Sequence, residues 1–398
     1  MTDSQRDPTV PRASDPAYAM RVLQDLSGID MATWNALVAA QPSGGHPFVD
    51  WRFLRALETS ASVGGRSGWR PAHVVLERHG EPIAAAPLYR KSHSYGEYVF
   101  DWAWADAYRR HGLSYYPKGL VAAPFTPVPG PRLLARDDLS RRLLVRGLLE
   151  VARANEWSSL HLLFPEAGSE ASLREAGLLE RHGVQFHWQN PGWRDFADFV
   201  SQLTQPKRKK ILAERRKVRD AGIRMRCIEG ADITEADWDF FYRCYETTYE
   251  QHHSTPYLRR AFFSALSATM PEHLLLFVGT REHASSPIAA SLLFRDEHAI
   301  YGRYWGAIEY VPCLHFEASY YAPIEWAIER GIRRFEGGAQ GEHKMARGFL
   351  PVPTRSWHWL DHPAFNDAVS EFLVRERGGI DAYLDELEDR NPIRPGTA

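Results

Sequence analysis

The sequence predicts an α/β (α+β) protein of two tandem domains, each a mixed, mostly antiparallel sheet flanked by helices. Its 398 residues suffice for two domains, at about 100–200 residues each. Two segments share the order strand, polar turn, Pro-Ile-Ala-Ala, strand: HVVLERHGEPIAAAPL at 73–88 and LLFVGTREHASSPIAASL at 275–292. Each precedes an amphipathic helix and a short strand. This repeated order of elements indicates a duplicated unit.

Composition and charge exclude several classes of protein. Hydrophobic residues make up 44% and charged residues 25% of the chain, which is typical of a globular protein with a sizeable core. The formal net charge of −2 does not favour a protein that coats nucleic acid. Three scattered cysteines without a CxxC pair argue against a disulfide scaffold and a structural zinc site. The sequence shows neither a signal peptide nor an apolar stretch long enough to span a membrane, so we expect a cytoplasmic protein.

The first domain is expected at 18–190, after a disordered, proline-containing tail at 1–17. Apolar spacing predicts its elements in order: a strand at 21–26, helices at 31–40 and 48–57, a hairpin at 73–77 and 83–90, a helix at 139–155, a strand at 159–164, a helix at 173–179 and a strand at 184–188. Residues 91–138 are rich in Tyr, Trp, Pro and Gly and have no clear period. A loop of that length is typical of a functional surface.

The second domain is expected at 191–380, followed by a C-terminal tail at 381–398. Its predicted elements are first helices at 195–203 and 207–221, a strand at 224–228, and helices at 234–249 and 258–268. Strands at 274–278, 288–294 and 299–305, a helix at 316–330, and strands at 334–336 and 357–360 follow. Residues 364–373 are expected to form the first part of a terminal helix. Gly222 directly follows the 207–221 helix and is expected to end it. Pro323 is expected either to kink the 316–330 helix or to stand at the first turn of its regular part.

Three stretches resemble the FemAB-like predicted N-acyltransferases. They are the basic helix PKRKKILAERRKVRDAGI at 206–223, the segment 313–359 and the Pro-Ile-Ala-Ala hairpin at 287. The run GAQGEHKMARGF at 338–349 is the most specific element. The resemblance implies two tandem GNAT-like domains and the transfer of an acyl group from acyl-CoA or aminoacyl-tRNA to an amine.

The sequence departs from the patterns of both donor classes. GNAT acyltransferases bind the pyrophosphate of coenzyme A with a Gln/Arg-x-x-Gly-x-Gly/Ala loop, and the segment before the 316–330 helix lacks it. The Lys-x-x-Phe-Gly element of FemAB transferases has its nearest counterpart in Lys344 followed by Arg347-Gly348-Phe349, at a different spacing. The helical hairpin that those enzymes insert for tRNA is also missing, because 207–221 form one short helix. Both donors therefore stay open.

The stretch from 336 to 349 is the first candidate for a catalytic site. Its glycines allow sharp turns and close approach of a ligand, and loops after strands often carry chemistry. Glu336 and His343 are candidate catalytic bases for an acceptor amine, whereas Gln340, Lys344 and Arg347 are candidate binding residues. The alternative is a solvated loop with glycines at its turns.

Glu317 and Tyr320 lie within one turn at the start of the 316–330 helix and are also candidate catalytic residues. A tyrosine hydroxyl can protonate a leaving thiolate or alkoxide. The alternative is that Tyr320 packs in the core and that the Glu317 carboxylate only interacts favourably with the helix dipole near the helix N-terminus.

The candidate binding residues outside that region are mostly cationic. The stretch 207–219 of the 207–221 helix carries eight basic residues and one acid, so Lys207 and Lys210 are expected to contact the phosphates of coenzyme A, a nucleotide-linked substrate or RNA. The alternative is a solvated face. Arg303 lies on a strand whose backbone N–H groups are expected to stabilise an oxyanion, and Trp104 and Arg109 are expected to line the groove. No metal site is predicted.

The function that we expect is N-acyl transfer by direct attack. The donor is acyl-CoA or aminoacyl-tRNA, and the acceptor is a small-molecule or peptide amine in the groove between the domains. Because no cysteine or serine has an activating neighbour in the sequence, no covalent enzyme intermediate is expected. A tRNA contact through the basic helix is a further expectation. The alternative is a non-catalytic module that binds a peptidoglycan precursor or a peptide. The sequence leaves the oligomeric state open.

Overall fold

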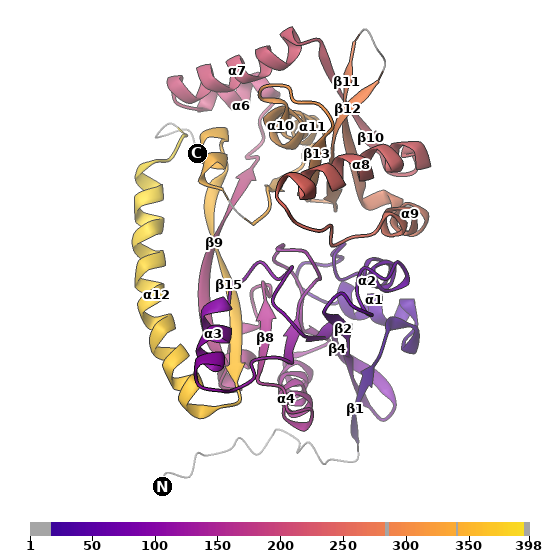
Figure 1. The fold of residues 1–398 in the computed structure, drawn as a ribbon, viewed down its shortest axis with the longest axis vertical. Coiled ribbons are helices and arrows are strands. Elements are labelled where there is room, and N and C mark those ends of the chain that lie inside the picture. The colour runs from indigo at the N-terminus through magenta and orange to yellow at the C-terminus, as the bar shows by residue number, and fades with distance from the viewer. Residues whose placement is uncertain (1–16, 283–285, 340, 394–398) are drawn as a thin grey trace.

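The computed structural model describes residues 17–282, 286–339 and 341–393, and Figure 1 shows two lobes joined along one side by long strands. The elements of the first lobe are, in chain order, β1 (Tyr18–Leu23), η1 (Leu26–Gly28), α1 (Met31–Ala39), α2 (Trp51–Thr59), β2 (Trp69–Pro71), β3 (His73–Arg78), β4 (Glu81–Ala86), β5 (Leu88–Lys91), α3 (Trp102–Arg110), β6 (Lys118–Val121), β7 (Leu134–Ala135), α4 (Asp138–Ala154), β8 (Ser159–Leu163), α5 (Glu170–Glu175) and β9 (Leu179–Gln189).

The second lobe follows with a similar set of elements. They are α6 (Phe196–Gln202), α7 (Gln205–Asp220), β10 (Ile223–Glu229), η2 (Gly230–Asp232), α8 (Glu235–Gln251), α9 (Arg260–Thr269), η3 (Pro271–His273), β11 (Leu274–Arg281), β12 (Pro287–Arg295), β13 (Ala299–Ala307), α10 (Leu314–Phe316), the π-helical turn η4 (Glu317–Tyr321), α11 (Ala322–Glu329), β14 (Arg334–Glu336), η5 (Glu342–Arg347), β15 (Leu350–Leu360) and α12 (Pro363–Asp389).

The described strands form two sheets. The larger sheet has the order β10-β11-β12-β13-β14-β9-β15-β8-β6-β5-β2 and passes from the second lobe into the first, while the smaller has the order β1-β3-β4-β7. Each lobe repeats one arrangement: an antiparallel hairpin (β3–β4 or β11–β12), then two parallel strands (β6 and β8, or β13 and β14) joined by a helical crossover. The two tandem α/β domains predicted from the duplicated hairpin are therefore present.

Two strands cross the boundary between the lobes. The end of β9, residues 187–189, pairs with β14 of the second lobe. β15 pairs first with β9 and then, over residues 356–360, with β8 of the first lobe. The boundary expected at 190 therefore falls where the lobes exchange strands, and one continuous sheet holds them together (Figure 1).

Helix α12 packs along β9 and β15 on the outer side of this junction (Figure 1). Arg181 of β9 donates two hydrogen bonds, of 2.8 and 2.7 Å, to the carboxylate of Glu376. The helix runs to Asp389, and Leu387 is fully buried. The prediction that residues from 381 onwards form a tail is therefore wrong for 381–389, because the last turns of α12 pack against the second lobe. Residues 394–398 lie outside the described part, as do 1–16 of the predicted N-terminal tail.

An aromatic core fills the space between α2 and the second lobe. The ring of Phe48 lies 4.9 Å from that of Phe294 and 5.3 Å from that of Tyr301, and Phe53 packs edge-on against Phe262. Phe48 was expected inside a helix, but α2 begins at Trp51, because Asp50 caps it by accepting a hydrogen bond from the backbone N–H of Arg52. These contacts join the two lobes through buried rings.

Some other boundaries also differ from the predictions. The region 91–138, expected to lack regular structure, contains α3, β6 and β7. The last strand starts at Leu350 rather than at 357. The helix expected at 316–330 contains the π-helical turn η4 before Pro323. A proline has no N–H to donate to the carbonyl of Ser319, which lies four residues earlier, and a wider turn accommodates this loss.

No helix in the described part of the chain is long and apolar enough to cross a bilayer.

Candidate functional site

The parallel strands β13 and β14 separate after three residue pairs. They pair over residues 299–301 and 334–336; β13 then continues along β12 to Ala307, whereas β14 ends at Glu336 and is followed by two glycines. A bulge beside Arg303 disturbs the register on the β12 side, where Leu292 faces Tyr304 but Leu293 faces Gly302. Such a bulge bends and twists a strand, and the divergence leaves an opening in the centre of the second lobe.

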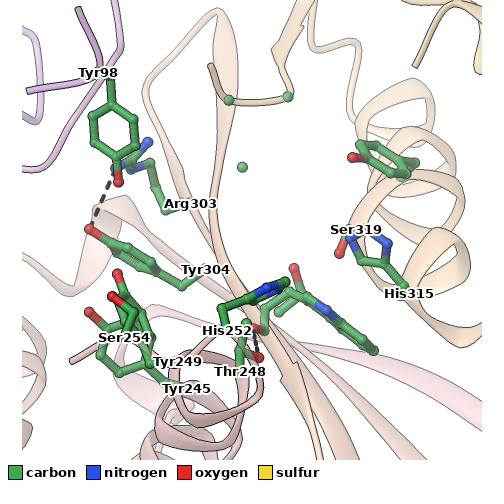
Figure 2. A pocket seen from close by; sticks show the side chains of 16 residues that line it. Tyr98, Tyr245, Thr248, Tyr249, His252, Ser254, Arg303, Tyr304, His315 and Ser319 are labelled. Carbon is green, nitrogen blue, oxygen red and sulfur yellow. Dashed lines mark hydrogen bonds between the residues drawn. The ribbon is translucent and has the colours of Figure 1, made fainter. Parts of the chain in front are cut away.

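A cavity of about 400 Å³ occupies this opening (Figure 2). Side chains and backbone from β12, β13, α8, the helix that starts at α10 and the loop after β14 line it, together with Tyr98 from the first lobe. Gly306 permits the close packing of α8 on β13, since a Cβ there would lie 1.9 Å from the carbonyl oxygen of Cys244. The glycine at 338 has a φ of +86°, which L-residues rarely adopt. The predicted Gly-Gly segment thus forms part of the cavity wall.

One wall of the cavity is phenolic. Tyr245 and Tyr249 of α8, Tyr304 of β13 and Tyr98 turn toward the cavity around Arg303 (Figure 2). The Tyr245 ring packs 5.2 Å from that of Tyr304. Sequence reasoning missed these four tyrosines, although Tyr98 lies in the aromatic segment expected to be functional. The four-residue spacing of Tyr245 and Tyr249 is equally typical of a helix face that packs in a core.

The opposite wall carries a possible proton-transfer pair. His315 and Ser319 lie on this wall (Figure 2). Tyr320, the next residue in the chain, also lines the cavity, and its hydroxyl lies 3.2 Å from Nε2 of His343. Burial raises the pKa of Tyr320 to about 12. Burial, with the nearby cations of Lys344 and Arg347, lowers the pKa of His343. At neutral pH the phenol therefore keeps its proton and the imidazole is uncharged.

Lys344 lies just beneath the glycine segment. Its side chain is buried, and Nζ donates a 2.9 Å hydrogen bond to the carbonyl oxygen of Gly338. Burial lowers the pKa of this amine to about 7, because the charged form loses hydration that the protein does not replace with a carboxylate. Lys344 supports the cavity floor and is able to change its charge near neutral pH.

Glu336 directly precedes the two cavity-lining glycines, and its carboxylate lies beside Arg334 of β14 and His187 of β9. One carboxylate oxygen lies 3.0 Å from Nε of Arg334 and the other 3.8 Å from Nε2 of His187. Burial raises its pKa to about 7. Glu336 is not among the residues that line the cavity, although its carboxylate interacts electrostatically with the lining residue Arg303.

Glu317 and Arg347 are occupied by ion pairs with helix α7. Glu317 accepts hydrogen bonds from Arg215, the shortest at 2.9 Å, and borders a separate hollow beside β10. Arg347 donates to Glu214 at 3.0 Å and stacks 3.4 Å above the Phe316 ring. Both residues were candidates from the sequence; the contacts indicate instead that they fasten α7 to the rest of the lobe.

The remaining candidates lie apart from the cavity. Trp104 is buried against His358, and Arg109 is exposed and paired with Asp106 one turn away. Lys207 and Lys210 lie on α7 at the surface of the second lobe. Gln340 lies outside the described residues. Among the described candidates, Arg303 and Tyr320 line the cavity, and His343 and Lys344 contact residues that do.

The corresponding opening in the first lobe is filled by the chain itself. β6 and β8 pair in parallel only over residues 119–121 and 160–162. The following segment folds back between them: Gly130 bridges to Pro165, and the buried Arg132 donates hydrogen bonds to the carbonyl oxygens of Leu163 and Val128. The chain itself thus crosses the point at which the parallel strands of the first lobe separate.

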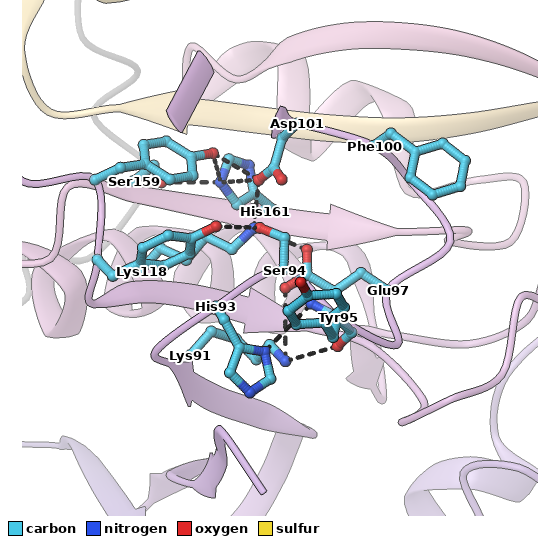
Figure 3. A network of polar contacts seen from close by, with 12 residues as sticks. Lys91, His93, Ser94, Tyr95, Glu97, Phe100, Asp101, Lys118, Ser159 and His161 are labelled. Atoms are coloured by element: carbon cyan, nitrogen blue, oxygen red, sulfur yellow. Dashed lines mark hydrogen bonds and ion pairs between the residues drawn. The ribbon is translucent and has the colours of Figure 1, made fainter. Parts of the chain in front are cut away.

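The first lobe instead contains a buried polar network (Figure 3). Lys118 Nζ donates to Glu97, Asp101 and Ser94. The hydroxyl of Tyr115 donates to Asp101, and the network continues from Tyr115 to His161 and, through a 2.7 Å contact between imidazoles, to His358 of β15. This network joins the last strand to the first lobe. Within the described residues, no group of three or more His, Cys, Asp or Glu side chains is placed to hold a metal ion.

Comparisons with solved structures find the same two-lobed architecture in other proteins. The structure of FemX superposes with a TM-score of 0.52 at 11% identity, covering 86% of this chain and 98% of that chain. L-PGS from Bacillus licheniformis gives 0.53 at 11% identity, covering 86% and 97%. A tandem GNAT protein from the clavulanic acid biosynthesis pathway gives 0.45 at 11% identity, covering 87% and 99%. Comparison with curated proteins gave no match.

The chain thus consists of two tandem α/β domains with the fold that FemX and L-PGS share with it. The FemAB-like family, described as peptidoglycan biosynthesis/recognition, matches residues 25–395. The chain belongs to that family, which confirms the resemblance seen in the basic helix and in the run from 338 to 349.

Proposed function

We propose that the protein transfers an acyl or aminoacyl group from an activated donor to an amine acceptor in the cavity between β13 and β14. The divergence of these strands over a cavity with a Tyr320–His343 pair is the observation that carries the proposal. The family description, peptidoglycan biosynthesis/recognition, supports a cell-wall peptide or its precursor as the acceptor.

In the proposed reaction, the acceptor nitrogen attacks the donor carbonyl directly. The C–N bond forms, and the bond from the carbonyl carbon to the leaving sulfur or oxygen breaks. Tyr320 gives its phenolic proton to the leaving atom and receives a proton from the acceptor nitrogen, so the enzyme returns to its starting state. His343 holds the phenol through its hydrogen bond.

The backbone of β13 beyond Tyr301 supports the negative charge of the tetrahedral intermediate. In the described sheet this part of β13 has a neighbouring strand only on the β12 side. Preorganised N–H donors of this kind are worth about 3–4 kcal/mol each in acyl transfer. Glu336 and Glu317 take no direct part, because Arg334 and Arg215 hold them outside the cavity.

The donor is proposed to bring an anionic group against α7. The exposed amines of Lys209 and Lys210 and the partly exposed amine of Lys207 form no ion pair with any described residue. Such a row attracts the phosphates of either acyl-CoA or aminoacyl-tRNA. The cytoplasmic location expected from the sequence suits both donors and stays a prediction.

The alternative function is binding without catalysis, of a peptidoglycan precursor or a peptide. The family description includes peptidoglycan recognition as well as biosynthesis, which supports binding without catalysis as a second candidate function. The two functions differ in one outcome: a binding module retains an amine ligand but forms no amide from it.

The experiment combines purified protein with labelled acetyl-CoA or charged tRNA and a panel of amino acids, peptides and cell-wall precursors, and follows amide formation by mass spectrometry. Tyr320→Phe keeps the ring and removes the proton donor, and we expect kcat to fall by about 10²-fold or more. Tyr18→Phe, on the outer strand β1, is the matched control and should leave the rate unchanged. Equal rates in wild type and Tyr320→Phe would reject the mechanism, and saturable binding without product would favour the binding module.

A further inference from the structure

Arg303 presents a cation to the cavity without a carboxylate partner. Its Nη2 donates to the carbonyl oxygen of Phe125 and lies 3.5 Å from the hydroxyl of Tyr304. Within the described residues, no Asp or Glu forms an ion pair with it, whereas its neighbours Arg334 and Arg347 pair with Glu336 and Glu214 at 3.0 Å.

The partners of Arg303 are a carbonyl oxygen and phenols. Its hydrogen bonds to Phe125 and Tyr304 both involve Nη2, the hydroxyl of Tyr98 also interacts with the guanidinium, and the side chain is part of the cavity lining. A guanidinium shielded from bulk water without a countercharge is costly. Its planar pair of N–H groups matches a carboxylate in a bidentate arrangement.

The described residues that line the cavity around Arg303 are rich in hydrogen-bond donors and include no acid. The nearby carboxylate of Glu336 interacts electrostatically with Arg303 but is paired with Arg334. The described lining residues are Tyr98, Tyr245, Thr248, Tyr249, His252, Ser254, Ser291, Gly302, Arg303, Tyr304, Trp305, His315, Ser319, Tyr320, Gly337 and Gly338. Burial raises the pKa of Tyr98 above its ordinary range, so this phenol remains a donor beside the guanidinium. Figure 2 shows the phenols of the same wall turned toward this end of the cavity.

We propose that Arg303 binds a carboxylate of the acceptor, so that the acceptor is an amino acid or a peptide with a free carboxyl group beside its reacting amine. That the bound molecule is the acceptor rests on the proposed function, whereas the binding of a carboxylate at Arg303 does not. A phosphate is the less suitable anion, because a dianion usually requires more than one cation or a cluster of backbone N–H groups, and Arg303 is the single arginine or lysine among the described lining residues.

The arrangement also orients the acceptor. Arg303 and the phenols occupy one wall, while His315 and Ser319 lie across the cavity on the other (Figure 2). Tyr320 follows Ser319 in the same helical turn and also lines the cavity. A ligand whose carboxylate is held at the first wall extends its amine toward the second. Substrates without the carboxylate lose this orientation, so the residue sets specificity as well as affinity.

The test measures binding by calorimetry without any donor. The probes are the L- and D-amino acids and short dipeptides, each compared with its C-terminal amide, and inorganic phosphate. We expect at least one carboxylate probe to bind wild type about tenfold or more tightly than its amide. The preference should vanish in Arg303→Gln, weaken in Arg303→Lys, and persist in Arg136→Gln, which alters an exposed arginine of the first lobe.

The result would overturn the inference if no probe binds with a carboxylate preference, if the preference survives in Arg303→Gln, or if inorganic phosphate binds more tightly than every carboxylate. Circular dichroism and thermal melting establish that each variant is folded; if Arg303→Gln does not fold, Arg303→Lys and Tyr98→Phe must both reduce the preference. Carboxylate binding without turnover would reject only the proposed reaction, and turnover without the preference would reject only this site.

Discussion

The hydroxyl of Tyr320 and Nε2 of His343 lie 3.2 Å apart, although one residue belongs to the helix after β13 and the other to the loop after β14. The pair therefore closes the cavity on the side where the two parallel strands have separated. Several measurable consequences follow from this arrangement and from the ion pairs around it.

The first prediction concerns the pH dependence of turnover. The active form needs a neutral His343, and its pKa lies below its ordinary value of about 6.5 because of burial and of nearby Lys344 and Arg347. We expect kcat to rise with pH along a limb whose midpoint lies below 6.5. His343→Gln keeps a hydrogen-bond acceptor for Tyr320 but does not titrate, so this limb should disappear from the kcat profile. An unchanged limb in the variant would show that another group controls it.

The second prediction concerns the ion pair between α7 and the glycine-rich loop. Arg347 is 2% exposed and bonds to Glu214 at 3.0 Å. Removing one partner leaves a buried charge, so Arg347→Met should lower the free energy of unfolding by about 3–5 kcal/mol. In a double-mutant cycle with Glu214→Gln, the combined loss should be smaller than the sum of the single losses. Denaturant unfolding provides the measurement, and strict additivity would contradict the coupling.

The third prediction concerns acid stability at the junction of the lobes. His161 and His358 are buried, with Nδ1 atoms 2.7 Å apart. Burial lowers the pKa of His161 to about 3 and that of His358 well below its ordinary value. Because the unfolded chain binds protons more readily than the folded one, unfolding free energy decreases as pH falls below about 6.5, and for His161 the loss continues to about 3.

The measurement is unfolding free energy at pH 7 and pH 4.5 for wild type and His358→Gln. Each buried histidine contributes at most about 1.4 kcal/mol per pH unit over this interval. We therefore expect the variant to lose about 2 kcal/mol less than wild type between the two pH values. The exposed His111→Gln is the control, with wild-type pH dependence expected. Identical pH dependence in His358→Gln would mean that this imidazole is not kept neutral by folding.

The fourth prediction distinguishes the two donors. If aminoacyl-tRNA binds α7, its affinity should fall steeply with salt, and changing Lys207, Lys209 and Lys210 to Gln should reduce the slope of log K against log salt by up to about 2–3. Arg109→Gln, an exposed arginine on α3, should leave the slope unchanged. Filter binding over a salt series provides the measurement. A salt-independent affinity would exclude the tRNA contact and leave acyl-CoA as the proposed donor.

The fifth prediction concerns the packing of α8 on β13. A Cβ at Gly306 would lie 1.9 Å from the backbone carbonyl oxygen of Cys244, so Gly306→Ala must displace the helix that carries Tyr245 and Tyr249. We expect a loss of about 1–3 kcal/mol in unfolding free energy and weaker binding of any cavity ligand. Gly378→Ala in α12 has open space around its Cβ and should stabilise the protein by up to about 1 kcal/mol. Equal stability of the two variants would contradict the close contact.

Local patterns were sufficient for much of the architecture. The Pro-Ile-Ala-Ala hairpins, the amphipathic helices and the repeated order of elements predicted two α/β domains, because periodicity and turn chemistry act between residues close in sequence. The glycines after Glu336 also indicated a ligand-facing segment, since their conformational freedom is a local property, and Gly337 and Gly338 do line the cavity.

The sequence alone therefore determined most of the helices and strands, the duplication and the family, but not α3, β6 and β7. Only the tertiary structure decided which side chains share the cavity. Tyr98 reaches it from the other lobe, whereas Glu317 and Arg347 are withdrawn from it by Arg215 and Glu214 more than one hundred residues away. Ion-pair partners, the exchange of β9 and β15 and the filling of the first lobe's opening depend on long-range contacts, and no local spacing encodes which distant residues will meet.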